Sequence, residues 1–283
     1  MGILNWFGAH PLRPAVGAIV AILVLGSAAN VLGPPQMQRD WYPYLSHTPE
    51  VELTETDFIV SPVSDWSYDW GGETDTAYLS SASYNFDQLR GVWFMLEPQP
   101  GSQLAAHTLL LFEFEGDRLL GVTIEARREQ GEEYSALHGQ FNAFELIYIW
   151  ASARDLLVRR AVMLDHEVFV YPVAITEAQS RDLLRTLLTR TGELSRTPRY
   201  YNTVLSNCTN ELAKAAGFNW APAFILTGRS DEYLYRRGVI PGESFRQAHR
   251  RSDVTEFVQA LNQAPAQAFD AALLAELRRR NAR

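Results

Sequence analysis

The strongest structural signal in the sequence is a predicted β-hairpin near its middle. Two apolar runs, His107–Phe114 and Leu119–Ala126, have the length and composition of strands, and the segment Glu115–Arg118 between them carries turn residues. If the turn centres on Gly116, each residue of one strand pairs with the residue equally far from Gly116 on the other. We therefore expect an antiparallel sheet with these two strands side by side.

Further strands are expected on both sides of this hairpin. Short apolar runs at Gly91–Leu96, Glu145–Trp150 and Val168–Val173 suit buried strands, and Leu53–Val60 alternates weakly between apolar and polar residues. The run Leu156–Arg160 fits either a strand or a helix.

Helical patterns dominate the second half of the chain. Thr176 and Gln179 form a predicted capping box, leucines follow at helical spacing, and Gly192 is the expected end of that helix. A shorter helix is expected at Cys208–Ala216, and an amphipathic helix at residues 265–280. Because strands come first and helices later, the predicted class is α+β, an antiparallel sheet with packed helices.

An uncharged apolar segment at residues 15–32 predicts a membrane-associated N-terminus. Its length is just sufficient for a membrane span, Arg13 precedes it, and no acidic residue occurs before Asp40. The rest of the chain is then expected outside the cytoplasm. The segment is either an uncleaved single-pass anchor or a signal peptide cleaved after Ala29, and a buried core helix is the remaining alternative.

Composition and cysteine content exclude several classes of function. The 283-residue chain has a formal net charge of −8, which argues against a nucleic-acid partner, because affinity for phosphates comes mainly from clustered cations. Its single cysteine, Cys208, permits neither an internal disulfide nor a multi-thiolate metal motif. Three histidines, His138, His166 and His249, fall in polar surface contexts without ligand spacing. We expect no metal, no cofactor and no nucleic-acid partner, and the oligomeric state stays open.

Cys208 is the residue best placed for chemistry. It follows residues that favour N-caps at the start of a predicted helix, where the helix N-terminus lowers the pKa of a thiol. His107 opens a predicted strand after two alanines and is the candidate base. In the hairpin register above, Glu125 lies opposite His107, where a carboxylate would orient the imidazole. A register shifted by one residue would place Glu125 on the other face.

Each of these residues also has a structural interpretation. A lone cysteine is often a buried hydrophobe, and a strand histidine often has a structural role. Glu125 close to Arg127 and Arg128 fits half of a surface ion pair.

Five further residues are candidates for substrate contact. They are Tyr201, Asn202, Asn207, Arg127 and Arg154. The first three come from the turn-rich segment before Cys208 and would bind substrate or an oxyanion, with turn formation as the alternative. The two arginines would meet an anionic head group, with structural ion pairs as the alternative.

Four segments carry motifs that recur in a known order. They are AHTLLLFEF, VTIEARREQGEEYSALHGQFNAFELIYI, ARDLLVRRAVMLDHEVFVYPV and RYYNTVLSNCTNEL. In order and approximate spacing they resemble the Lnb N-terminal periplasmic domain family, with its His-bearing strand, its "S-V-E-x-R-x-E-x-G-E" strand, its "E-R-D" segment and its "Y-N-T-x-x-N-C-T" loop. Two departures stand out: Ala153 replaces the Glu of Glu-Arg-Asp, and Val122–Ile124 replaces the usual Ser-Val run.

The resemblance implies a permuted papain-like (NlpC-like) thiol-enzyme fold, with the histidine strand before the cysteine helix. Cys208 then matches the nucleophile, His107 the base and Glu125 the candidate orienting acid. The implied function is that of a membrane-anchored periplasmic cysteine acyltransferase or hydrolase acting on lipoprotein or lipid acyl groups, because members of the Lnb type are implicated in N-acylation of bacterial lipoproteins. The alternatives are an NlpC-like peptidoglycan amidase or endopeptidase, and a non-catalytic envelope binding module with a structural cysteine.

The expected organisation follows from these segments. It comprises a short cytoplasmic N-terminus (1–14), an inner-membrane anchor or signal peptide (15–32), a linker with an aromatic-rich part (33–100), a catalytic core (101–217) and a C-terminal helical extension (218–283).

Overall fold

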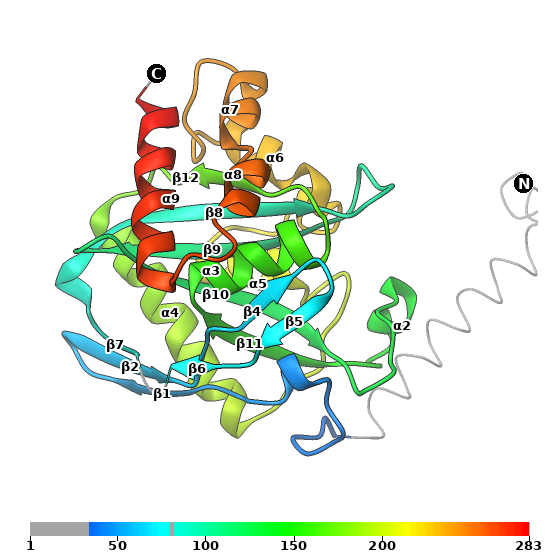
Figure 1. The fold of residues 1–283 in the computed structure, drawn as a ribbon. Coiled ribbons are helices and arrows are strands. Elements are labelled where there is room, and N and C mark those ends of the chain that lie inside the picture. Colours follow the sequence, from blue (N-terminus) through cyan, green and yellow to red (C-terminus); the bar gives the residue numbers. More distant parts are fainter. Residues whose placement is uncertain (1–33, 80–81, 283) are drawn as a thin grey trace, which may run out of the picture.

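A seven-stranded sheet forms the centre of the computed structural model, which describes residues 34–79 and 82–282 (Figure 1). Its strands are β3 (Val63–Ser64), β6 (Tyr78–Leu79), β8 (Leu89–Pro98), β9 (Ala106–Phe114), β10 (Arg118–Arg127), β11 (Glu145–Ala151) and β12 (Phe169–Pro172). Their order across the sheet is β12-β8-β9-β10-β11-β3-β6. Neighbours are antiparallel except β11 and β3, which pair in parallel, so the sheet is mixed.

Two smaller sheets come from the aromatic-rich part that precedes the hairpin. One has the order β1-β2-β7 and the other is the hairpin of β4 and β5. These strands are β1 (Glu50–Leu53), β2 (Asp57–Ser61), β4 (Ser67–Asp69), β5 (Gly72–Asp75) and β7 (Ala82–Asn85).

Helices cover both faces of the large sheet (Figure 1). On one face lie α4 (Glu177–Arg196) and α5 (Cys208–Ala215), and on the other lie α3 (Ala153–Val158), α8 (Thr255–Ala260) and α9 (Ala266–Asn281). The remaining helical segments are η2 (Pro43–Leu45), η3 (Phe86–Gln88), α2 (Ala136–Gln140), the π-helical turn η4 (Arg159–Met163), η5 (Pro222–Phe224), η6 (Thr227–Arg229), α6 (Ser230–Arg236) and α7 (Phe245–Ser252).

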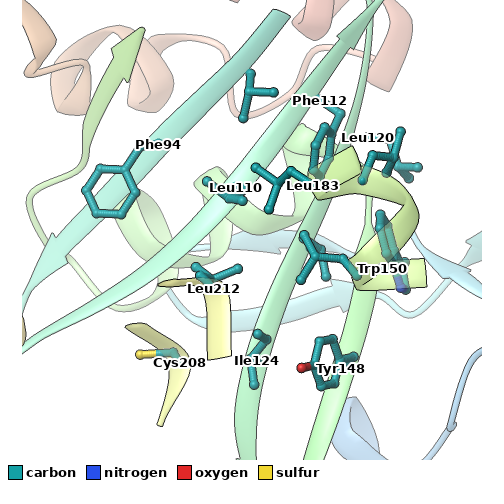
Figure 2. Packing of buried hydrophobic residues seen from close by; sticks show 14 of the residues in the cluster. Phe94, Leu110, Phe112, Leu120, Ile124, Tyr148, Trp150, Leu183, Cys208 and Leu212 are labelled. Atoms are coloured by element: carbon teal, nitrogen blue, oxygen red, sulfur yellow. The ribbon is translucent and has the colours of Figure 1, made fainter. Parts of the chain in front are cut away.

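Because helices bury both faces of the sheet, the sequences of the central strands are continuous apolar runs. Alternate residues of β8 and β9 belong to different halves of the core: Phe94 and Leu110 face α4 and α5, whereas Met95 and Leu111 face α3. Figure 2 shows the first of these halves, where Leu212 of α5 and side chains of α4 pack onto the strands.

The predicted hairpin and its register are confirmed. β9 and β10 pair from Phe114 with Arg118 to Leu109 with Thr123, so partners lie equally far from Gly116. Gly116 and Asp117 have φ of +76° and +53°, the left-handed conformation that a tight hairpin turn requires at its centre. The turn chemistry of the sequence thus sets the register of the two strands that position the site.

Most predicted elements form, with three differences. Leu156–Arg160 takes its helical alternative, in α3 and the π-turn after it. Leu53–Val60 is divided between β1 and β2 by a turn. The capping box at Thr176 is present, but α4 continues beyond Gly192 to Arg196. One helical glycine costs only about 1 kcal/mol, and the next turn buries Leu194 in the core.

The α+β class is confirmed, whereas the expected N-terminal membrane segment at 15–32 lies outside the described residues. Within 34–79 and 82–282, no helix has both the length and the apolar character needed to cross a membrane.

Candidate active site

Cys208 is the first residue of α5, and the local sequence fixes that start. Asn207 is the N-cap, and its side-chain oxygen accepts a hydrogen bond from the Asn210 N–H at 2.8 Å. Thr209 anchors the helix to β9 through a buried hydroxyl contact with Thr108 at 2.9 Å. The cysteine side chain is 5% exposed and lies beside Ile124 of β10 (Figure 2).

His107 and Glu125 lie two residues beyond the last paired residues of β9 and β10, at the end of the hairpin. The His107 Nε2 is 3.2 Å from the Glu125 Oε1 and 2.6 Å from the Thr123 Oγ1. The Thr123 hydroxyl donates to the same carboxylate oxygen at 2.8 Å. Nε2 is therefore occupied by these acceptors, which leaves Nδ1 as the ring nitrogen available to the Cys208 sulfur.

Burial alone would raise the pKa of Cys208, but the positive charge of His107 and its hydrogen bond outweigh burial, and the Thr108 backbone N–H also donates to the sulfur. The pKa of Cys208 is therefore lowered. Burial would lower the pKa of His107, yet the charges of Glu125 and Cys208 raise it to about 10. These opposite shifts favour a resting thiolate–imidazolium pair.

Arg160 holds the carboxylate of this arrangement. It is 3% exposed, and its guanidinium contacts Glu125 at 3.3 Å and Glu97 at 2.7 Å. Burial would raise the pKa of Glu125, but the charges of His107 and Arg160 lower it well below its usual range. Both glutamates are thus kept ionised around one buried cation.

Glu97 and His166 complete the polar cluster and were not foreseen from the sequence. Glu97 is the direct partner of His107 across β8 and β9, and its carboxylate is 2.6 Å from the His166 Nδ1. His166 was expected in a surface context but lies against this buried carboxylate, after the turn that follows α3. No local pattern marks it, because the contact joins residues far apart in the chain.

A cavity of about 450 Å³ connects these groups. His107, Glu125 and Cys208 line it together with His166 and Arg160. Its other walls include Tyr42, Tyr44, Arg128, Tyr134, Arg159, Tyr201, Ile225 and Thr227. Two of the three candidates from the turn-rich segment, Tyr201 and Asn207, reach this cavity, and the buried Tyr201 ring faces it beside Tyr134.

The two candidate asparagines have structural roles here. The Asn207 amide donates to the backbone oxygens of Thr203 and Phe224, both at 2.8 Å, so its donors are used. The Asn202 side chain accepts from two backbone N–H groups of its own turn and donates to Gln140. Turn formation, the alternative given above, describes both.

The two candidate arginines also form structural contacts instead of lining the cavity. Arg127 donates to the backbone oxygens of Leu45 and Ser46. Arg154 pairs with Asp65 at 2.9 Å and donates a hydrogen bond to the Ser67 hydroxyl. Neither residue lines the cavity, and the arginines that do are Arg128, Arg159 and Arg160.

In the part of the chain that the structure describes, no group of three or more His, Cys, Asp or Glu side chains is arranged to hold a metal ion.

The comparisons with known proteins agree with the motifs in the central region. The family model of the Lnb N-terminal periplasmic domain matches residues 76–239, which is more than half of the chain. No curated protein and no solved structure matches significantly. The match includes every residue of the cluster around Cys208, and the family supports a periplasmic location. The chain belongs to the Lnb N-terminal periplasmic domain family.

Proposed function

We propose that this protein is a periplasmic cysteine acyltransferase or hydrolase, with a papain-like thiol site in permuted order. The observation that carries the proposal is the position of Cys208 at the start of α5, against an imidazole that Glu125 orients through Nε2. A lowered thiol pKa beside a raised imidazole pKa is the electrostatic arrangement that thiol nucleophiles need.

In the first half-reaction, the Cys208 thiolate attacks the carbonyl carbon of an ester or amide and a C–S bond forms. The first-turn N–H groups of Cys208 and Thr209 have no partner within an α-helix and are the donors for the oxyanion. As the intermediate collapses, the carbon–oxygen or carbon–nitrogen bond breaks and the His107 imidazolium gives its proton to the leaving group.

In the second half-reaction, an amine or water attacks the thioester. His107, now neutral, accepts a proton from the nucleophile, and the thiolate leaves. The resting thiolate–imidazolium pair is then restored, with Glu125 still ionised beside the imidazole.

A lipid or lipoprotein acyl group is the proposed substrate. If residues 15–32 anchor the chain in the inner membrane, nine residues separate that segment from Tyr42 in the cavity wall. The ten residue-to-residue steps from Leu32 to Tyr42 span at most about 35 Å, so the cavity would lie close to the membrane surface. This short tether supports a substrate held in the lipid.

Trapping of the acyl intermediate tests the proposal. The protein is incubated with p-nitrophenyl butyrate, and intact mass is measured at short times. We expect one butyryl group on the wild-type protein, and none on folded Cys208→Ala or His107→Ala variants. An adduct on the Cys208→Ala protein would show that another residue reacts, and the proposal would fail.

A further inference from the structure

The cavity contains a second histidine–carboxylate pair, which the mechanism above does not use. The Nδ1 of His166 lies 2.6 Å from the Glu97 Oε1, and Glu97 is 3% exposed. Burial would raise the pKa of Glu97, but Arg160 and His166 lower it, so the carboxylate is ionised. An ionised carboxylate accepts the hydrogen bond, and Nδ1 therefore carries the proton.

This pairing leaves the other ring nitrogen of His166 available to a molecule in the cavity. The Nε2 has no hydrogen-bond partner among residues 34–79 and 82–282, and the side chain, 16% exposed, lines the same cavity as Cys208. The backbone fixes the ring from the other side, because the His166 N–H donates to the Arg160 oxygen at 2.9 Å. An oriented imidazole with an unpaired ring nitrogen in a cavity has the geometry of a general base.

The number of protons that the acceptor loses shows where a second base is needed. An amine acceptor arrives as an ammonium ion at neutral pH and must lose two protons to become an amide. His107 can take only one of them, which restores its imidazolium. Water or an unprotonated amine loses a single proton on attack, so His107 alone suffices for those nucleophiles.

We infer that His166 is the catalytic base that accepts the first proton of a protonated primary-amine acceptor, and so makes this site a transferase. The inference rests on the proposed function. The ammonium N–H bond breaks and its proton moves to the His166 Nε2, while Glu97 holds the resulting imidazolium. The free amine then attacks the thioester, its second proton passes to His107, and the C–S bond breaks to release the thiolate.

The experiment follows the decay of the butyryl group on Cys208 by intact mass at pH 7. Three nucleophiles are compared: water, hydroxylamine, whose nitrogen is unprotonated at this pH, and n-butylamine, which is protonated. In His166→Gln we expect the butylamine reaction to slow by about 10²–10⁴-fold, with hydroxylamine and water unchanged. Alkylation of Cys208 at the wild-type rate shows that the site is intact.

The matched control is His249→Gln. His249 also faces a carboxylate, with its Nδ1 3.3 Å from Asp231, but it does not line the cavity. We expect all three rates of this variant to equal those of the wild-type protein. In His166→Ala, free imidazole should restore the butylamine reaction alone.

Three outcomes overturn the inference. Equal slowing with all three nucleophiles would mean that His166 supports the structure of the site and is not the base for the amine. An unchanged butylamine rate, with the acyl group still formed on Cys208, would remove His166 as the base and leave the proposed function standing. Absence of the acyl group in the wild-type protein would overturn the proposed function itself, and this assignment with it.

Discussion

Replacement of Glu125 by glutamine isolates the charge that holds the thiolate–imidazolium pair. The substitution keeps the shape and one acceptor oxygen, but it removes a negative charge 3.2 Å from the His107 Nε2. A neighbouring opposite charge shifts a pKa by about 1–3 units, and each unit corresponds to about 1.4 kcal/mol. The ratio of ion pair to neutral pair should therefore fall about 10- to 1000-fold.

Arg160 adds to this effect. In the wild-type protein its guanidinium is shared between Glu125 and Glu97. Without the Glu125 charge, one of its two carboxylates is lost, and the uncompensated positive charge further disfavours the imidazolium of His107. Both effects act in the same direction, so a small response is not expected.

The assay is the rate of Cys208 alkylation by iodoacetamide between pH 4 and pH 9. Because the pKa of Cys208 is lowered, the wild-type rate should persist below the pKa of a free thiol, about 8.5, and fall only at lower pH. In Glu125→Gln the fall in rate should move up toward the pKa of a free thiol. Glu133→Gln removes the same charge at an exposed residue outside the cavity and should match the wild-type protein. Superimposable profiles for Glu125→Gln and wild type would refute the ion-pair reasoning.

Three further substitutions test the fold around the site. Burial raises the pKa of Asp270 from 3.8 to about 7, so the folded state loses stability as pH rises through that interval. Urea unfolding should show Asp270→Asn to be more stable than the wild-type protein by up to about 4 kcal/mol at pH 8, and equally stable below pH 4. In Gly121→Ala the new Cβ would lie 2.2 Å from a buried methyl of Leu156, and chemical denaturation should show a loss of about 1–3 kcal/mol; an unchanged midpoint would contradict this close packing. Asn207→Ala removes the cap of α5 and two backbone contacts, so thermal unfolding should report a loss of about 1–3 kcal/mol, and an unchanged melting temperature would contradict the capping role.

Local signals were sufficient for the elements that carry the candidate triad. The left-handed turn at Gly116 fixed the register of β9 and β10, and with it the approach of Glu125 to His107. The N-cap at Asn207 placed Cys208 at a helix start. In each case the determining interaction joins residues close in sequence, or related by one tight turn.

The rest of the site depends on contacts that no local pattern encodes. Glu97 reaches the cluster because β8 pairs with β9, and His166 reaches it from the segment after α3. Arg160 lies on a π-helical turn in a run whose sequence fits a strand equally well. Arg154 shows how a distant partner goes unseen: its charge suggests a ligand, and in the structure it pairs with Asp65, almost ninety positions away.

The wall formed by Tyr42, Tyr44 and Leu45 has an evolutionary consequence. These residues border the cavity, yet they precede the segment 76–239 that the family model matches. The candidate catalytic residues therefore lie in the part of the chain that the family model matches, while one side of the cavity comes from a stretch outside it. Under the proposed function, exchange of that stretch would alter which molecules enter the cavity without changing Cys208, so substrate selectivity and catalytic chemistry would be encoded by separate parts of the chain.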